Sequence, residues 1–235
     1  MSATIGFDTA TAVLTVAAAN GDEVIAEVGH GPDDEGRPRA SELLLVELER
    51  IAAAAGGWEG INRIAVGIGP GSFTGLRIGV ATARALAQGR ALPLAAVSTL
   101  AALGRGIGER EPGADALAVI DARRGEAFAA LYDERGGEAW APFVCGPEEL
   151  GERAAGLQRA PLAAGDGSVR FREQLEAAGV RVAAPDDPVH RVAARHICAL
   201  GDREPARAPA EIEPLYLREP DAQRWLKRDD RDFSH

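Results

Sequence analysis

Gly67-Ile68-Gly69-Pro70-Gly71-Ser72-Phe73-Thr74-Gly75-Leu76-Arg77-Ile78-Gly79 is the stretch that decides the fold of this chain. The segment 64–68 is short, apolar and β-branched, as in a buried strand, and Gly-Pro-Gly ends that strand. A helix is predicted to begin near Ser72 or Thr74, whose hydroxyls can cap free backbone N–H groups. A strand, a tight turn and a helix N-terminus in series form a place where an anion or a phosphate can bind.

The glycines of this stretch also have a structural interpretation. Gly75, Gly79, Ala83 and Ala87 are four residues apart, so one stripe of the helix carries almost no side chain and can press against a neighbouring element. We favour close packing as the main use of these glycines and keep phosphate binding as the alternative. A P-loop is excluded, because that motif needs a lysine after its last glycine and the chain's only lysine is Lys227.

Working outward, the first hundred residues alternate strands and helices. Strands are predicted at 4–7, 13–17, 24–28, 64–68 and 94–97, and helices at 41–55, from Ser72 or Thr74, and from Ser98. Ser41 is the expected N-cap of the first helix, whose inward face carries Leu44, Leu48, Ile51 and Ala55. Three strands, helix, strand, helix, strand is the order of a ribonuclease-H-like α/β half.

A second block with a similar pattern follows a loop predicted at 104–113. Strands are predicted at 116–121, 126–132, 138–144, 161–164 and 180–183, and helices at 147–155, 169–178 and 189–200. The last helix is expected to turn Val189, Val192, Ala193, Ile197 and Leu200 inward. Two such halves around a cleft form the α/β fold of actin-like ATPases (the ASKHA fold). We divide the chain into a first half at 1–104, a smaller second half at 105–203, a segment 204–220 that returns to the first half, and a polar tail at 221–235.

Several motifs together resemble one known family. Gly69 to Gly79, read as GPGSFTGLRIG, is similar to the signature of the TsaB (YeaZ) family. Further segments fit that family in the right order, namely IGFDTAT at 5–11, RASELL at 39–44, PLAAVSTL at 93–100, IDARRGE at 120–126 and PLYLR at 214–218. The resemblance covers about residues 3 to 218. Ala40 departs from it, because the family usually has a histidine there.

The resemblance implies a cytoplasmic, non-catalytic scaffold subunit of the machinery that makes threonylcarbamoyladenosine beside the tRNA anticodon. Such a subunit pairs with TsaD, lets TsaE dock, meets tRNA only through the complex, and closes on itself as a homodimer when alone. No cofactor is expected to be tightly bound, although ATP or ADP with Mg²⁺ is expected at the complex interface. The candidate interface residues on the two N-terminal helices are Leu44, Leu48, Ile51, Leu76, Val80 and Arg84. Replacing Val80 by Glu or Arg is expected to disrupt pairing and leave the monomer folded.

A nucleotide site within the chain is the competing hypothesis. Asp8 ends the first strand, where actin-like ATPases place the aspartate that meets metal and phosphate, but an Asx turn explains that residue equally well. The candidate nucleotide-binding residues are Asp8, Thr9, Gly71, Ser72, Thr74 and Arg77. Asp166, between two glycines, marks either a second phosphate loop or a simple turn. The alternative function is therefore an active small-molecule kinase or ATPase of the actin-like fold.

Composition and motifs argue against other classes. A formal net charge of −10 argues against a surface that holds nucleic acid by itself. We identify no signal peptide, membrane-spanning run, nucleophile elbow or metal-binding histidine pair, and we name no catalytic or metal-ligating residue. His190 and His196 are expected to be solvated or capping side chains, and Cys145 and Cys198 to be reduced thiols.

Overall fold

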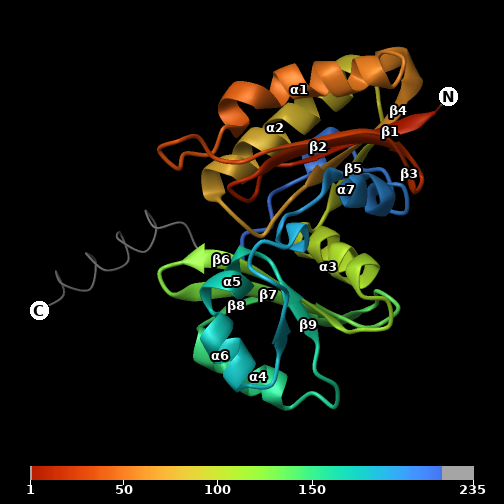
Figure 1. Ribbon diagram of the computed structural model, residues 1–235. Helices are drawn as coiled ribbons and strands as arrows, with labels where there is room; N and C mark the ends of the chain where they lie inside the picture. Colours follow the sequence, from red (N-terminus) through yellow and green to blue (C-terminus); the bar gives the residue numbers. More distant parts are fainter. Residues whose placement is uncertain (1, 219–235) are drawn as a thin grey trace, which may run out of the picture.

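The computed structural model describes residues 2–218, and the chain folds there into two five-stranded sheets with helices on both faces of each (Figure 1). The predicted α/β architecture of two halves is thereby confirmed. The polar tail predicted at 221–235 lies outside the described residues, as do the last two residues of the returning segment.

The first sheet has the strand order β3-β2-β1-β4-β5. Its strands are β1 (Ala3–Asp8), β2 (Leu14–Asn20), β3 (Glu23–His30), β4 (Ile61–Gly67) and β5 (Leu94–Val97). The three N-terminal strands form an antiparallel meander, whereas β4 and β5 run parallel to β1. Two long helices, α1 (Ala40–Ala54) and α2 (Phe73–Arg90), cover one face, and α7 (Ala194–Gly201) covers the other (Figure 1). A single turn of 3₁₀ helix, η1 (Trp58–Gly60), leads into β4.

The second sheet has the order β10-β9-β6-β7-β8. Its strands are β6 (Ala116–Arg123), β7 (Glu126–Tyr132), β8 (Glu138–Cys145), β9 (Leu162–Ala164) and β10 (Arg181–Val182). One face packs on α3 (Thr99–Arg110), and the other packs on α4 (Pro147–Ala155), α5 (Asp166–Arg170) and α6 (Arg172–Ala177). Two 3₁₀ turns, η2 (Pro188–His190) and η3 (Pro209–Glu211), complete the described chain.

Two helices cross between the halves. α3 begins in the first block of sequence but packs on β6 of the second sheet, and α7 comes from the second block but packs on β1 and β2. The segment after α7 returns to the first sheet, where Ile212 is buried and Leu215 donates its N–H to the carbonyl oxygen of Ile68. The two helices also contact each other, which joins the two cores.

The loop predicted at 104–113 is wrong, because α3 continues to Arg110 through three glycines. Two of these glycines lie close to other elements, and the contact at Gly104 excludes a side chain. A Cβ at Gly104 would enter the ring of Tyr132, and a Cβ at Gly106 would lie 3.2 Å from Nε2 of His196. The packing of a helix against its neighbours therefore outweighs the low helix propensity of glycine here.

The last predicted helix also begins later than expected. Residues 188–190 form η2, and the α-helix starts only at Ala194, where the N–H groups of Ala194 and Arg195 donate to Thr15 and Glu27. These caps come from β2 and β3 and cannot be seen locally in the sequence. Two smaller differences are that the helix predicted at 169–178 is divided at Phe171, and that Ser41 lies inside α1 rather than at its N-cap.

Candidate functional site

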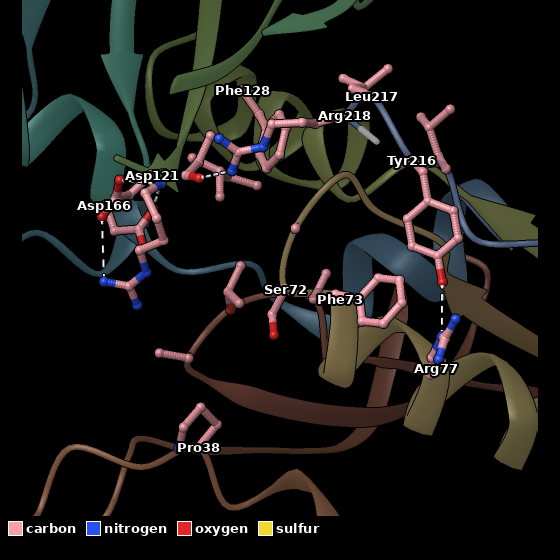
Figure 2. A pocket seen from close by; sticks show the side chains of 18 residues that line it. Pro38, Ser72, Phe73, Arg77, Asp121, Phe128, Asp166, Tyr216, Leu217 and Arg218 are labelled. Carbon is pink, nitrogen blue, oxygen red and sulfur yellow. Dashed lines mark hydrogen bonds and ion pairs between the residues drawn. The ribbon is translucent and has the colours of Figure 1, made fainter. Parts of the chain in front are cut away.

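A cavity of about 740 Å³ opens between the two halves (Figure 2). It is bounded by the turn after β1, the start of α2, the end of β6, the start of α5 and the returning segment after η3. Its polar and aromatic lining includes Ser72, Phe73, Arg77, Asp121, Arg123, Phe128, Asp166, Tyr216 and Arg218. Its volume lies within the range of small-molecule sites.

The start of α2 is packed closely against the turn after β1. Ser72 is the N-cap, as expected, and its Oγ accepts the N–H of Gly75 at 3.4 Å. A Cβ at Gly75 would lie well under 3.0 Å from the backbone oxygen of Thr9, and a Cβ at Gly79 would meet the Thr9 hydroxyl. The Thr9 hydroxyl itself donates to the carbonyl oxygen of Gly75 at 2.8 Å. Close packing, the favoured interpretation of the glycine stripe, is confirmed.

The candidate nucleotide-binding residues divide into two groups. Gly71, Ser72 and Arg77 line the cavity. Asp8 and Thr9 are buried outside its lining, and Thr74 is exposed outside it. The cavity lining thus brings together only half of the predicted set.

Asp8 is sealed inside the first half. Its Oδ2 accepts the Thr99 hydroxyl at 2.6 Å, and its Oδ1 accepts the N–H of Ala10 at 2.8 Å in an Asx turn. A Cβ at Gly67 would collide with Oδ2, so this glycine leaves the space that the carboxyl fills. Burial raises the pKa of Asp8, although the hydrogen bonds from Thr99 and Ala10 oppose that rise. These hydrogen bonds match the Asx turn, which was one of the two roles that the sequence left open for Asp8.

An aromatic and basic cluster forms one rim of the cavity. The rings of Phe73 and Tyr216 lie 5.3 Å apart, and the Arg77 guanidinium lies 3.8 Å over the Phe73 ring. Arg77 also donates to the Tyr216 hydroxyl at 3.4 Å (Figure 2). This cluster links the start of α2 to the returning segment 213–218, and nothing local in the sequence indicates that link.

Two aspartates form the opposite wall. Asp121 accepts both hydrogen bonds from one nitrogen of Arg170, at 2.9 and 2.7 Å, and its own N–H donates to Asp166 at 2.9 Å. Burial raises the pKa of Asp166, against the lowering effect of that backbone hydrogen bond. Arg218 crosses from the returning segment to bond with Glu126 and with the carbonyl oxygen of Ala122. Most of the charged side chains at the cavity therefore already form ion pairs or hydrogen bonds within the protein.

The residues of this chain do not fit a magnesium nucleotide of the kind that actin-like ATPases hold. Asp8 is fully buried and both its oxygens accept hydrogen bonds, so it cannot reach a hydrated cation in the cavity. Within residues 2–218 no group of three or more His, Cys, Asp or Glu side chains is placed to hold a metal ion.

Most of the residues predicted to form the partner interface do not lie on the surface. Leu44, Leu48, Ile51, Leu76 and Val80 are each no more than 3% exposed, because they form the face of α1 and α2 that packs on the first sheet. Arg84 is half-buried. The apolar stripe of each helix is therefore used inside the monomer, and the Val80 substitutions expected to spare the fold would place a charge in the core.

The outer face of the same two helices is a different surface. Leu45 and Val46 of α1 are 62% and 61% exposed, more than any other large apolar residue in the described chain. On α2, Ala81 and Ala85 are exposed one turn apart, and Ile78 is half-buried. We call these five residues the outer helix face.

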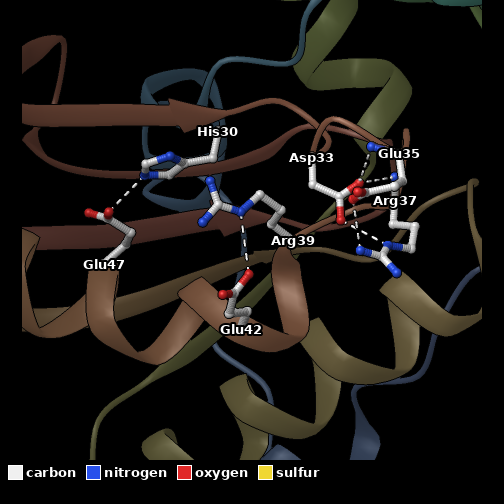
Figure 3. Close-up of polar contacts among 7 residues, drawn as sticks. All are labelled: His30, Asp33, Glu35, Arg37, Arg39, Glu42 and Glu47. Carbon is white, nitrogen blue, oxygen red and sulfur yellow. Dashed lines mark hydrogen bonds and ion pairs between the residues drawn. The ribbon is translucent and has the colours of Figure 1, made fainter.

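Polar contacts fix α1 against the edge of the sheet. Glu47 is almost buried on α1 and accepts hydrogen bonds from His30 at 2.7 Å and Arg50 at 2.6 Å (Figure 3). Burial raises the pKa of Glu47, but the Arg50 and His30 contacts outweigh that effect and lower it. Asp33 organises the loop before α1 by accepting the N–H groups of Glu35 and Arg37 (Figure 3). The outer helix face is thus presented by a firmly placed helix.

The histidine expectation is wrong for His196, which is only 2% exposed. His190 is half-buried, accepts the Gly165 N–H at Nδ1 and bonds with the Ala184 carbonyl oxygen through Nε2 at 2.8 Å. Cys145 and Cys198 are both buried and free. No helix within the described residues is long and apolar enough to cross a membrane.

Comparison with known proteins gives a consistent set of relatives. A family model described as TsaD, tRNA N6-adenosine threonylcarbamoyltransferase, matches residues 32–198. The tRNA threonylcarbamoyladenosine biosynthesis protein TsaB of Escherichia coli is 31% identical over 222 residues, which cover 91% of this chain and 94% of the relative. An uncharacterized protein of Mycobacterium tuberculosis is 30% identical, with 95% of each chain covered.

Solved structures agree with the sequence relatives. A Pseudomonas aeruginosa protein described as similar to the peptidase YEAZ superposes with a TM-score of 0.75 at 27% identity, and covers 93% of this chain and 100% of that one. A hexokinase of the ROK class from Thermus thermophilus superposes at 0.52 with 12% identity, over 86% and 98% of the two chains, which shows the shared fold alone. The predicted actin-like ATPase fold is confirmed.

Proposed function

This chain belongs to the TsaB (YeaZ) family, and on that premise we propose that it is a non-catalytic scaffold in the formation of threonylcarbamoyladenosine on tRNA. It acts in the cytoplasm at the adenosine next to the anticodon. TsaD pairs with it and carries the chemistry, TsaE docks on the pair, and tRNA is met only through the complex.

The observation that carries this proposal is the outer helix face. Leu45 and Val46 leave large apolar side chains in water on a helix whose inner face is already packed. Small residues at 81 and 85 of the neighbouring helix let another helix approach closely. A second helical pair laid on α1 and α2 would complete a four-helix arrangement and remove both side chains from water.

The partner that fits this face is a protein of the same fold. The TsaD model matches 71% of the chain's length, 167 of its 235 residues, so TsaD is expected to carry a corresponding pair of helices. A stable contact needs about 800 Å² on each partner, which is more than five side chains supply, so neighbouring residues of both helices must take part. In the absence of TsaD, the same face closes against a second copy of this chain.

In this proposal, nucleotide binds to the complex and not to the isolated chain. Because the cleft of this chain lacks an accessible Asp8, ATP or ADP with Mg²⁺ would need groups from a partner, and none is held tightly by the chain alone. Nucleotide titrated into the isolated chain and into the pair with TsaD tests this point by calorimetry. Binding with Mg²⁺ to the isolated chain would contradict it.

The interface is tested by placing a charge on the outer helix face. Leu45→Glu and Val46→Glu are expected to abolish co-elution with TsaD, while the circular dichroism spectrum and melting temperature of the monomer stay unchanged because both side chains are exposed. Val24→Glu is the matched control, since Val24 is 40% exposed on β3, away from α1 and α2. Undiminished pairing of the Leu45 and Val46 variants would reject this surface.

A further inference from the structure

A second cavity of about 530 Å³ lies on the opposite side of the first sheet from α1 and α2, and we call it the rear cavity. It is enclosed by β2, the edge strand β3, α3, the segment 187–193 and α7. Of these elements, α3 and α7 also contact each other and are labelled near each other in Figure 1. Three glycines, Gly29, Gly31 and Gly106, contribute no side chain to its lining and so keep it open.

The buried imidazole of His196 lines the rear cavity. Nδ1 of His196 lies 3.5 Å from Oε1 of Glu109, and among residues 2–218 its Nε2 has no hydrogen-bond partner. A Cβ at Gly106 would be 3.2 Å from Nε2, so the missing side chain is what leaves room beside that atom. Burial lowers the pKa of His196 to about 3, which makes the ring neutral at pH 7.

The tautomer of His196 follows from its neighbour. The 3.5 Å contact of Nδ1 with Glu109 is not a hydrogen bond, but a carboxylate favours the ring tautomer that carries its proton on the nearer nitrogen, Nδ1. Nε2 is then an acceptor with a free lone pair next to the cavity. An occupant that donates an O–H or N–H at this point would satisfy it.

Two of the three arginines that line the rear cavity form ion pairs, and the third, Arg191, is exposed. Arg195 bonds with Glu27 through its guanidinium at 2.8 Å, and Arg110 bonds with Asp187 at 3.1 Å. Arg191 also lines the cavity, and no carboxylate within the described chain pairs with it. A planar guanidinium that has no carboxylate partner can bind the carboxylate of a ligand with two parallel hydrogen bonds.

We propose that the rear cavity binds a small carboxylate that also carries a hydroxyl or amino group, such as a hydroxy acid or an amino acid. Arg191 holds the carboxylate, and Nε2 of His196 accepts the hydrogen bond of the second group. The cavity is separate from the outer helix face, so occupation is compatible with the pairing proposed above.

The test is a titration of the full-length protein with L-lactate, L-serine and acetate, followed through the backbone amide signals in NMR spectra. Lactate and serine are expected to give saturable shifts at Gly106, Arg191 and His196. Acetate has the carboxylate but no second donor, so it is expected to bind at least tenfold more weakly. Absence of saturable binding at millimolar ligand, or equal binding of acetate, would overturn the proposal.

Two variants and a control assign the binding to this cavity. Arg191→Gln removes the carboxylate partner, and Gly106→Ala fills the space beside Nε2; each is expected to weaken lactate binding at least tenfold while the rest of the spectrum is retained. Arg203→Gln changes an exposed arginine outside the cavity and is expected to leave binding unchanged. Equal affinity of the Arg191 and Arg203 variants, or full binding by Gly106→Ala, would show that the ligand lies elsewhere.

Discussion

The glycines of α2 give a graded prediction, because each meets a different neighbour. A Cβ at Gly75 would lie well under 3.0 Å from the carbonyl oxygen of Thr9 and 3.1 Å from its carbonyl carbon, both backbone atoms. A Cβ at Gly79 would meet only the Thr9 hydroxyl, which can rotate away. A Cβ at Gly89 would meet nothing within 4 Å.

The magnitudes follow from these contacts. Overpacking costs about 1–3 kcal/mol, and the helix propensity gained by Gly→Ala returns at most about 1 kcal/mol. Gly75→Ala must displace backbone, so we expect a net loss of about 2–3 kcal/mol and a fall of roughly 5–10 °C in Tm. Gly79→Ala forfeits the hydrogen bond from Thr9 to Gly75, worth about 1 kcal/mol, and Gly89→Ala is neutral or stabilising.

The assay is thermal and urea unfolding of the three variants, followed by circular dichroism. A double variant adds an internal check: Thr9→Ala removes the hydroxyl that a Cβ at 79 would meet, so Gly79→Ala should cost less in that background. Two results would refute the packing account of these glycines. One is an equal melting temperature for Gly75→Ala and Gly89→Ala, and the other is an unchanged loss of stability from Gly79→Ala in the Thr9→Ala background.

Three further predictions concern buried groups. Thr99→Val is expected to destabilise the protein by about 2–3 kcal/mol in urea unfolding, because it removes the hydrogen-bond partner of both Asp8 and the Gly69 N–H, and a change below about 0.5 kcal/mol would refute that account. The pKa of His196 is depressed from its ordinary value of 6.5 to about 3 in the folded protein, so the unfolded chain takes up the proton first and stability falls as the pH falls below about 6.5. This amounts to about 2 kcal/mol at pH 5, and His196→Gln should remove that part of the pH dependence of unfolding; an unaltered slope would contradict the assignment. Val80→Glu is expected to yield little folded protein, because Val80 lies in the core, and a folded Val80→Glu monomer by circular dichroism would contradict its burial.

Much of the fold can be predicted from local signals. The strand before Gly69, the cap at Ser72 and the strand 94–97 depend on short-range patterns of apolar and turn residues, and the structure has all three. Where the prediction fails, the cause is a distant contact. α3 contains Gly104 because the ring of Tyr132, at the end of β7, fills the space that a side chain would need.

The site was less predictable than the fold, for two reasons. An apolar stripe at helical spacing identifies the buried face of a helix, so Leu44 and Val80 were found by the pattern that places them in the core. The signal for a surface was the excess beyond that stripe, Leu45 and Val46, which was visible in the sequence. The lining of the cleft, by contrast, joins Phe73 to Tyr216 across more than a hundred residues, and no spacing rule connects them.

The measurement that tests the central claim most directly is tRNA threonylcarbamoylation reconstituted from TsaC, TsaD, TsaE, ATP, bicarbonate, threonine and tRNA of the same organism, with and without this chain. We expect no product from the chain alone and none from the other components without it. Adding the wild type or Val24→Glu should restore the modification, and adding Leu45→Glu should not. Full activity without the chain would contradict the scaffold role, and full rescue by Leu45→Glu would contradict the surface through which it is proposed to act.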